Sequence, residues 1–313
     1  MLGYVVRRVL STIPVMIFVA LFVFSLLYIA PGDPAAVIAG EHASPEDVEK
    51  IRKGLGLDQP FLVRFADWSG KVLVGDLGTS MFTGLPVSEL ILQRVEPTLS
   101  MMVVTLIFAV AVAIPLGVMA AWTAGSWFDR GVMAFAVLGF SVPVFVVGYL
   151  LAYVFGLELW WLPVQGYSPL SKGIWLWLES LILPAIALGL NYIALIARIT
   201  RATMLEVLSQ DYVRTGRAKG LGERPILFLH ALKNASVPIV TVIGIGIALL
   251  IGGAVVTESV FAIPGLGRLT IDAIVRRDYP LIQGIVLVFS FVYVLVNLAV
   301  DLTYTVLDPR IRY

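Results

Sequence analysis

Residues 234–257 read NASVPIVTVIGIGIALLIGGAVVT, a continuous run of apolar and small residues with no charged side chain. A helix of about 20 residues spans the roughly 30 Å of hydrocarbon in a lipid bilayer, so this run can cross a membrane. Five other charge-free windows have a similar length: Val9–Ala30, Pro97–Phe128, Gly131–Leu157, Ser180–Ala197 and Tyr279–Val300. They are continuously apolar rather than alternating, which excludes barrel strands. The sequence therefore predicts an all-α integral membrane protein with six transmembrane helices.

The composition indicates the same class. The chain has 313 residues, of which 59% are hydrophobic and only 14% are charged. A soluble domain could not cover its core with so few polar residues. There is no cysteine, which excludes disulfides and thiolate chemistry. The basic residues are scattered along the chain, so nothing points to nucleic acid as a partner.

Lysine and arginine residues in the short loops predict the orientation. If the N-terminus is cytoplasmic, the inner segments hold twelve such residues and the short outer loops hold four. The first window is longer than the core of a cleaved signal peptide, so we expect it to remain as a helix. The expected organisation is a cytoplasmic N-terminus and first helix (1–30), an extracytoplasmic insert (31–96), a five-helix core (97–305) with a cytoplasmic loop at 201–233, and a cytoplasmic tail (306–313).

The charged cytoplasmic segment DYVRTGRAKGLGERPILFLHALKN, residues 211–234, precedes the opening run. It could bind phosphate, contact lipid or dock another protein. A Walker A loop needs its lysine after the second glycine, whereas Lys219 precedes Gly220, and Glu223 would repel phosphate. The dinucleotide-binding spacing GxGxxG also fails, because Pro225 stands at its third glycine. These mismatches exclude nucleotide binding by this segment.

The local propensities instead predict two helices joined by a tight turn. Residues 201–218 carry an apolar stripe that is typical of a helix continuing from the fourth span. Gly220 and Gly222 permit the positive φ that a helix end and a chain reversal need. The acidic residue and proline that follow favour the start of a second helix. We expect a cytoplasmic elbow with Ala218–Glu223 at its tip.

The outer segments contain a helix signal and a tryptophan-rich loop. In SPEDVEKIRKGLG, residues 44–56, an N-cap serine, a proline in the first turn and basic residues before Gly54 predict a helix. The insert could present a surface to an extracytoplasmic partner or simply cover the ends of the spans, and both remain open. The four tryptophans of residues 160–177 are expected at the outer membrane interface.

Few polar residues lie within the expected spans. Gly139, Ser141, Pro143 and Gly148 make the third helix easy to break. Intramembrane polar side chains usually join helices, but four of them could also line a substrate path: Ser141, Tyr149, Asn191 and Tyr192. No charged residue is expected deep within a span, which argues against a proton relay or a voltage sensor.

The sequence offers no catalytic set. Its two histidines, His42 and His230, are expected on opposite sides of the membrane, and no HExxH motif or GxSxG elbow is present. We therefore expect neither catalytic residues nor a metal site in this chain. An intramembrane enzyme is disfavoured for this reason. The alternative function is that of a stand-alone secondary transporter or channel. Such a protein is expected to carry charged residues deep in the membrane or inverted repeats.

The segment 211–234 resembles the cytoplasmic signature of ABC-importer permeases, in the form DYVRTxRAKGL that is typical of the dipeptide, oligopeptide and nickel branch. Aligned on Gly220, the glycine, Leu232 and their spacing match the general pattern, whereas Arg214 and Lys233 replace its glutamate and proline. Other stretches resemble the same branch: APGDPA (30–35), LGLDQP (55–60), GDLGTS (75–80), VTESVFAIPGLGRL (256–269), RDYPLIQG (277–284) and VNLAVDLTYTVLDPRIR (296–312). The similarity is closest to the first permease subunit of a dipeptide-type importer.

The resemblance implies the six-helix fold of type I ABC-importer permeases in a bacterial cytoplasmic (inner) membrane. It implies four protein partners besides membrane lipid: a second similar permease, two cytoplasmic ATP-binding cassette subunits and an extracytoplasmic solute-binding protein. ATP and magnesium would be bound by the ATPases, and this chain would hold no cofactor. The implied substrate is a dipeptide or oligopeptide, and importers of glutathione or a nickel chelate share the same pattern.

The resemblance also implies two functional sites. The tip of the elbow would enter a groove of one ATPase through seven residues: Arg217, Ala218, Lys219, Gly220, Leu221, Gly222 and Glu223. The segment ESVFAIPGLGR, residues 258–268, would lie near an outer gate and the docking surface of the binding protein, through Glu258, Pro264, Gly265 and Gly267. The alternative is that this segment is only a tight connection between two helices.

Overall fold

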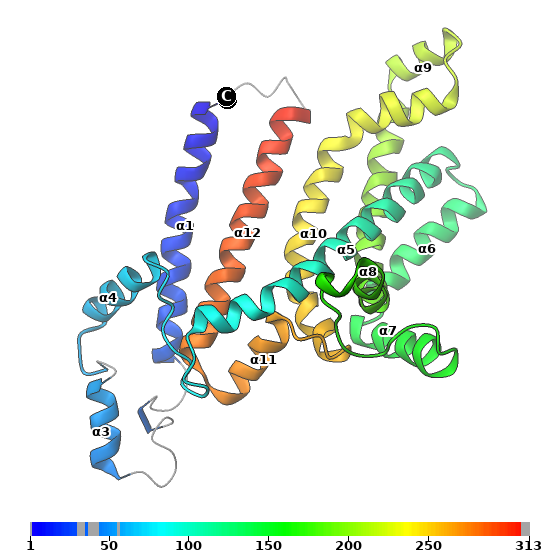
Figure 1. Cartoon of the computed structure of the whole chain (residues 1–313). Helices are drawn as coiled ribbons and strands as arrows, with labels where there is room; N and C mark the ends of the chain where they lie inside the picture. The colour runs from blue at the N-terminus through cyan, green and yellow to red at the C-terminus, as the bar shows by residue number, and fades with distance from the viewer. Residues whose placement is uncertain (1, 30–34, 37–43, 55–56, 308–313) are drawn as a thin grey trace. The chain divides into compact units, whose positions relative to one another are not determined.

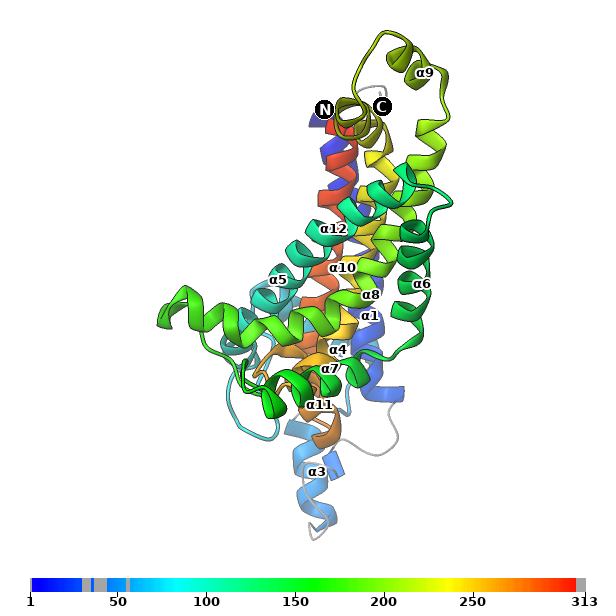
Figure 2. The same cartoon turned by 90° about the vertical axis from the view of Figure 1, so that its right-hand side faces the viewer.

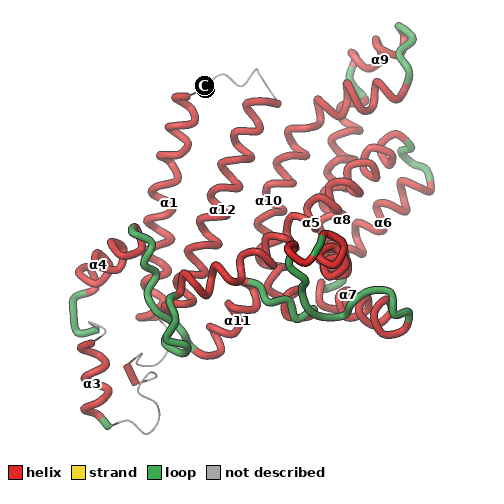
Figure 3. The backbone as a smooth tube through the Cα atoms, in the orientation of Figure 1, coloured by secondary structure: helices red, strands yellow, loops and turns green. Residues whose placement is uncertain are grey.

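The structure of the chain is a computed structural model that describes residues 2–29, 35–36, 44–54 and 57–307. His42, most of the motif at 30–35 and residues 308–313 of the tail lie outside the described residues. The described part is helical apart from turns, loops and one isolated antiparallel bridge between Thr79 and Pro86 (Figures 1 and 3). Its α-helices are α1 (Leu2–Ile29), α3 (Pro45–Gly54), α4 (Phe61–Leu73), α5 (Val87–Trp122), α6 (Trp127–Ser141), α7 (Val144–Leu151), α8 (Ile174–Leu208), α9 (Asp211–Ala218), α10 (Leu232–Val260), α11 (Leu266–Arg276) and α12 (Tyr279–Leu307).

The prediction of six spans is confirmed, with a correction to the third. Five helices are long and apolar enough to cross a membrane, and α6 and α7 make a sixth span only as a pair bent by 102°. The bend falls at Val142, whose extended backbone (ψ 122°) precedes Pro143. Proline has no N–H to continue the helix, and it disfavours helical geometry in the residue before it. The window Gly131–Leu157 is therefore a broken segment rather than one straight helix.

Two helices extend well beyond their charge-free windows. α5 begins at Val87, ten positions before Pro97, and α8 continues past Ala197 to Leu208. Two shorter π-helical segments, Ala152–Glu158 and Pro225–Ala231, lead out of α7 and into α10. Charge marks where a helix leaves hydrocarbon, but it does not end the helix, so the windows predicted the membrane-crossing parts alone.

The chain divides into two compact units, Met1–Val95 with Leu269–Val294, and Glu96–Arg268 with Leu295–Tyr313. In the second unit α8 packs against α6, α7 and α10, and 67% of its apolar window is buried. A Cβ on Gly117 of α5 would lie 2.6 Å from that of Thr200, and one on Gly246 of α10 would overlap the Tyr192 ring. These glycines allow α5 and α10 to approach α8 closely, as small residues do in membrane bundles.

The first unit contains the insert helices α3 and α4. The predicted helix at 44–54 is confirmed as α3, whose first turn includes a bond from the Val48 N–H to the Ser44 carbonyl (3.1 Å). α4 was not predicted. Its residues Phe61, Phe65 and Trp68 surround Phe24 of α1, with ring centroids 5.3–5.5 Å from that of Phe24. This aromatic contact fixes α4 to the end of the first span.

Candidate functional site

The predicted elbow is present, but its first helix is divided. α8 ends at Leu208, and after a break at Ser209 and Gln210 the separate helix α9 runs from Asp211 to Ala218. The prediction of one continuous helix over residues 201–218 was therefore wrong. The break redirects the chain, and α9 extends beyond the ends of α8 and α10 in both views (Figures 1 and 2).

The tip of the elbow turns at Gly220, where φ is +80°. The N–H of Gly220 donates to the carbonyl of Arg217 (3.0 Å), and the N–H of Leu221 donates to that of Gly216 (3.1 Å). These bonds satisfy carbonyls that the end of α9 would otherwise leave unpaired. The prediction of a positive φ is confirmed for Gly220 and wrong for Gly222, whose φ is not positive.

An ion pair closes the turn. The Arg217 guanidinium donates to both carboxylate oxygens of Glu223, at 2.8 and 3.1 Å. These hydrogen bonds hold the pKa of Glu223 below its ordinary value of 4.5. The contribution of the pair to stability is therefore fully present above about pH 4.5, and it is lost as the pH falls through the lowered pKa. Both side chains are about two-fifths exposed, so this contribution is less than about 1 kcal/mol.

Buried apolar side chains anchor the two helical segments of the elbow. Val213 of α9 and Ile226 are 2% and 1% exposed, and the Tyr212 hydroxyl accepts a bond from the Asn234 amide (2.7 Å). The second helical segment of the elbow, Pro225–Ala231, and the start of α10 pack in one cluster with the C-terminal ends of α5 and α8. The buried members of this cluster are Val118, Ala121, Met204, Val207, Leu227, Ala231, Ala235 and Ile239. His230 is exposed. Packing therefore holds the two helical segments of the elbow, whereas the turn between them lies at the exposed surface.

The tip itself presents an exposed surface. Leu221 is 44% exposed, and Ala218, Lys219, Gly220 and Gly222 are exposed as well. The structure therefore brings the seven predicted coupling residues together on one projecting turn. Whether they contact a partner stays a prediction.

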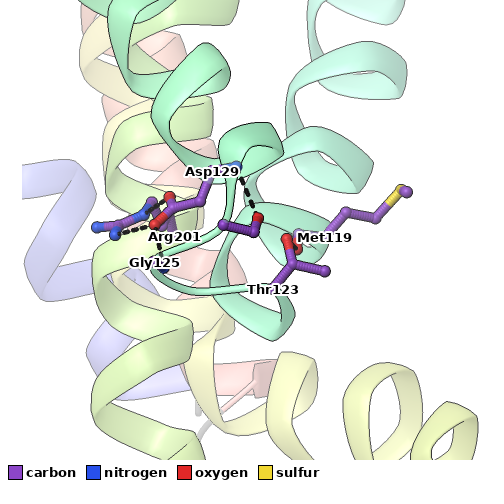
Figure 4. Close-up of polar contacts among 6 residues, drawn as sticks. Met119, Thr123, Gly125, Asp129 and Arg201 are labelled. Atoms are coloured by element: carbon purple, nitrogen blue, oxygen red, sulfur yellow. Dashed lines mark hydrogen bonds and ion pairs between the residues drawn. The ribbon is translucent and has the colours of Figure 1, made fainter.

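A partly buried ion pair that the sequence did not indicate lies near the C-terminal end of α8 (Figure 4). Asp129, at the start of α6, accepts two hydrogen bonds from Arg201, one of them from the terminal nitrogen at 2.7 Å. Asp129 also accepts the N–H of Gly125 (2.9 Å), and its own N–H donates to the Ser126 hydroxyl. The pair thus fixes the loop between α5 and α6 to the part of α8 that leads to the elbow.

Shortening Arg201 tests the strength of this connection. Arg201→Lys keeps the charge but cannot reproduce the two-pronged contact, so we expect a loss of about 1–2 kcal/mol in stability. Arg198→Lys is the matched control, because the Arg198 guanidinium lies over the Phe140 ring and is exposed. Thermal unfolding of the purified variants measures the difference. Equal unfolding temperatures for the two variants would show that the pair contributes little.

Two of the four predicted substrate-path residues line one pocket in the described structure, and a role of the four in a substrate path stays a prediction. Asn191 and Tyr192 line a pocket of about 250 Å³ with Phe140 and Val144, beside the break between α6 and α7. The Tyr192 hydroxyl donates to the carbonyl of Ile243, so it joins α8 to α10. Two others are not among the lining residues: Ser141 bonds its own helix at the Val137 carbonyl, and Tyr149 is 61% exposed.

The predicted outer segment 258–268 forms a turn around a buried carboxylate. Glu258 has no exposed surface, and it accepts hydrogen bonds from the Thr98 hydroxyl (2.6 Å) and the Arg268 N–H (2.9 Å). A Cβ on Gly265 would overlap this carboxylate. In this conformation the buried Glu258 carboxylate stabilises the turn through these hydrogen bonds. It stays a prediction that a binding protein contacts Glu258, Pro264, Gly265 and Gly267.

Two family models together match almost the whole chain. The model for the binding-protein-dependent transport system inner membrane component matches residues 113–313, and the model for the N-terminal part of such membrane components matches residues 1–102. Among solved structures, the MetNI methionine ABC transporter in an inward-facing form superposes with a TM-score of 0.59 at 18% identity, over 70% of this chain and 96% of that one. This similarity shows a shared fold.

Curated relatives of similar length carry names that agree with this family. A probable peptide ABC transporter permease of Sinorhizobium fredii is 55% identical over 99% of both chains. A dipeptide transport system permease of Alkalihalophilus pseudofirmus is 40% identical, and a glutathione transport system permease of Salmonella choleraesuis is 44% identical, each over the full length of both chains. The chain therefore belongs to the binding-protein-dependent transport system inner membrane component family, and it is a multi-pass permease of the ABC-importer type.

Proposed function

We propose that this chain is one of two permease subunits of an ATP-driven peptide importer, in which a second permease completes the substrate path. Two ATP-binding cassette subunits would bind ATP and magnesium, and an extracytoplasmic solute-binding protein would deliver the peptide. The names of the peptide and dipeptide relatives support this substrate class. Glutathione is the second candidate, because a relative at 44% identity carries that name.

The projecting tip of the elbow is the observation that carries the coupling proposal. Shifting a two-state equilibrium from 1:99 to 99:1 needs about 5.5 kcal/mol of differential interaction. An exposed ion pair such as Arg217–Glu223 contributes about 0–1 kcal/mol, which is too little. Burial of roughly 300 Å² of apolar surface gives about 7 kcal/mol before entropy losses. Burial of exposed apolar tip residues such as Leu221 in an ATPase groove would contribute to such an area.

Transport by the reconstituted complex tests this function. The complex is purified through a tag on this chain, placed in liposomes with ATP inside, and supplied with the solute-binding protein outside. Uptake of a dipeptide, a longer peptide, glutathione and a nickel chelate is then compared. ATP-dependent uptake of peptides supports the proposal. Purification without an ATPase, together with uptake driven by an ion gradient alone, would indicate a secondary transporter instead.

The proposed orientation places both termini and the elbow in the cytoplasm of a bacterial cell, within its inner membrane. The chain has no cysteine, so single introduced cysteines give an unambiguous label. We expect a membrane-impermeant maleimide to label Lys172→Cys in right-side-out vesicles and Lys219→Cys only in inverted ones. Both positions are exposed, which makes them a matched pair. The opposite labelling pattern would reverse the proposed topology.

A further inference from the structure

A pocket of about 390 Å³ lies in the first unit, where the end of α1, the helix α4 and the start of α12 meet. This volume is within the roughly 300–1,000 Å³ of small-molecule sites. The pocket belongs to neither the elbow nor the outer turn, and its lining combines aromatic rings with several basic side chains. It is therefore a separate candidate for ligand binding.

The position of the pocket along the spans indicates the kind of ligand. Phe24 and Leu27, which line it, lie at the end of the candidate span Val6–Leu27, and Tyr279 is the first residue of the span Tyr279–Thr303. Because one span ends and the other begins at the pocket, it lies at the level of lipid headgroups. Only 11% of the apolar window of each of these spans is buried within the chain, which leaves wide faces for lipid.

The charge of the lining favours an anion. Three basic side chains, Lys53, Arg64 and Lys71, line the pocket with a single carboxylate, Asp67. The Lys71 ammonium lies 2.8 Å from Asp67, and that of Lys53 lies 3.9 Å from Glu49 outside the lining. An ammonium has three N–H donors, so each lysine can bind a further acceptor while it keeps its carboxylate partner.

Apolar surface adjoins these cations. The guanidinium of Arg64 lies 5.7 Å from the centre of the Phe24 ring, and Trp68 of α4 contacts the same ring. Along α1, Phe18 is 69% exposed and Phe22 is 53% exposed. A phospholipid needs this combination, because its phosphate requires cations and its acyl chains require apolar contact. A free anion would use the cations alone.

We propose that this pocket binds the phosphate headgroup of an anionic phospholipid, such as phosphatidylglycerol. Arg64 and Lys71 contact the phosphate, and the Trp68 indole lies beside the glycerol. The acyl chains run along the exposed apolar residues of α1. Basic pockets beside membrane helices bind anionic headgroups through the same interactions.

Native mass spectrometry of the purified full-length chain tests the proposal. The chain is equilibrated in detergent micelles that contain equal amounts of phosphatidylglycerol and phosphatidylcholine, and the retained lipids are counted. We expect preferential retention of phosphatidylglycerol. The double variant Arg64→Gln/Lys71→Gln should bind it roughly 30-fold more weakly, since each basic residue near an anionic headgroup contributes about a factor of five.

Two control variants separate binding from folding. Arg64→Lys keeps the charge and should retain the lipid, and Lys172→Gln removes an exposed charge elsewhere in the chain and should have no effect. Equal retention of phosphatidylglycerol by the wild type and the double variant would overturn the proposal. Displacement of the lipid by an equal concentration of inorganic phosphate would overturn it as well, because the ligand would then be a free anion.

Discussion

Glu258→Ala is expected to release the turn at residues 261–268 and to lower the stability of this region by about 3–5 kcal/mol. The carboxylate has no exposed surface, and it accepts bonds from the Thr98 hydroxyl and the Arg268 N–H. The Thr98 oxygen in turn accepts the N–H of Leu266 at 2.8 Å. Alanine removes the carboxylate that accepts both hydrogen bonds, and a hydrogen bond to a charged group contributes about 1.5–3 kcal/mol. The cavity that remains adds a further cost.

The isosteric variant Glu258→Gln separates hydrogen bonding from packing. An amide offers one acceptor oxygen where the carboxylate offers two, so the hydrogen bond to one of its two oxygens is lost, either from the Thr98 hydroxyl or from the Arg268 N–H. We expect a loss of about 1–3 kcal/mol, which is smaller than for alanine.

Hydrogen–deuterium exchange over residues 259–268, together with thermal unfolding, measures the effect on the turn. Ser259→Ala is the matched control, because its exposed hydroxyl bonds only the Val255 carbonyl of its own helix in the described structure. Unchanged exchange in Glu258→Ala would contradict the role of the carboxylate. Transport by the same variants then distinguishes a gate from a simple connection, since only a gate makes uptake depend on the order of this turn.

The membrane-spanning helices could be predicted from the sequence. A long, continuously apolar window satisfies its backbone hydrogen bonds in a bilayer mainly as a helix, so the spans could be predicted from the pattern of charge. The sequence also predicted that the third span is easy to break, from Gly139, Ser141, Pro143 and Gly148 together. The helix α4 was missed although its signal is visible: Phe61, Phe65 and Trp68 follow one another at spacings of four and three, as on one face of a helix.

The contacts that fix the sites could not be predicted in the same way. Asp129 and Arg201 are 72 positions apart, and nothing near either residue indicates its partner. Tyr192 and Gly246 likewise meet only because α8 and α10 pack side by side. Long-range pairs of this kind depend on tertiary packing, whereas the turn at Gly220 depends on local backbone geometry and was predicted correctly.

Gly220→Arg is expected to abolish substrate-stimulated ATP hydrolysis by the assembled transporter while the permease remains folded in the membrane. Apart from the two neighbouring residues in sequence, no atom lies within 4 Å of a Cβ at this position, so the side chain can leave the turn without a clash at its first atom. The φ of +80° costs a residue other than glycine about 1–2 kcal/mol. We expect the elbow to remain folded, because buried apolar packing on both sides of the turn holds its helical segments. The arginine instead projects from the exposed tip and prevents close approach to the ATPase groove.

Three variants isolate the cause of this loss. Gly220→Ala introduces the backbone strain without the bulk, and we expect it to keep most of the stimulated activity. Gly84→Arg is the matched control, because Gly84 has a φ of +70° and equally open surroundings but lies in the insert. Arg217→Gln removes the exposed ion pair with Glu223, and its effect should be small, since that pair contributes less than about 1 kcal/mol.

The rate of ATP hydrolysis with and without the loaded binding protein, measured on the reconstituted complex, decides the outcome. Loss of about 5.5 kcal/mol of differential interaction changes the equilibrium between the two conformations by roughly 10⁴-fold, so stimulation should disappear rather than weaken. If Gly220→Ala fails as completely as Gly220→Arg, strain at the turn is the cause and insertion is not. Normal transport by Gly220→Arg would remove the tip from the coupling pathway, because no partner groove could then enclose Ala218–Glu223.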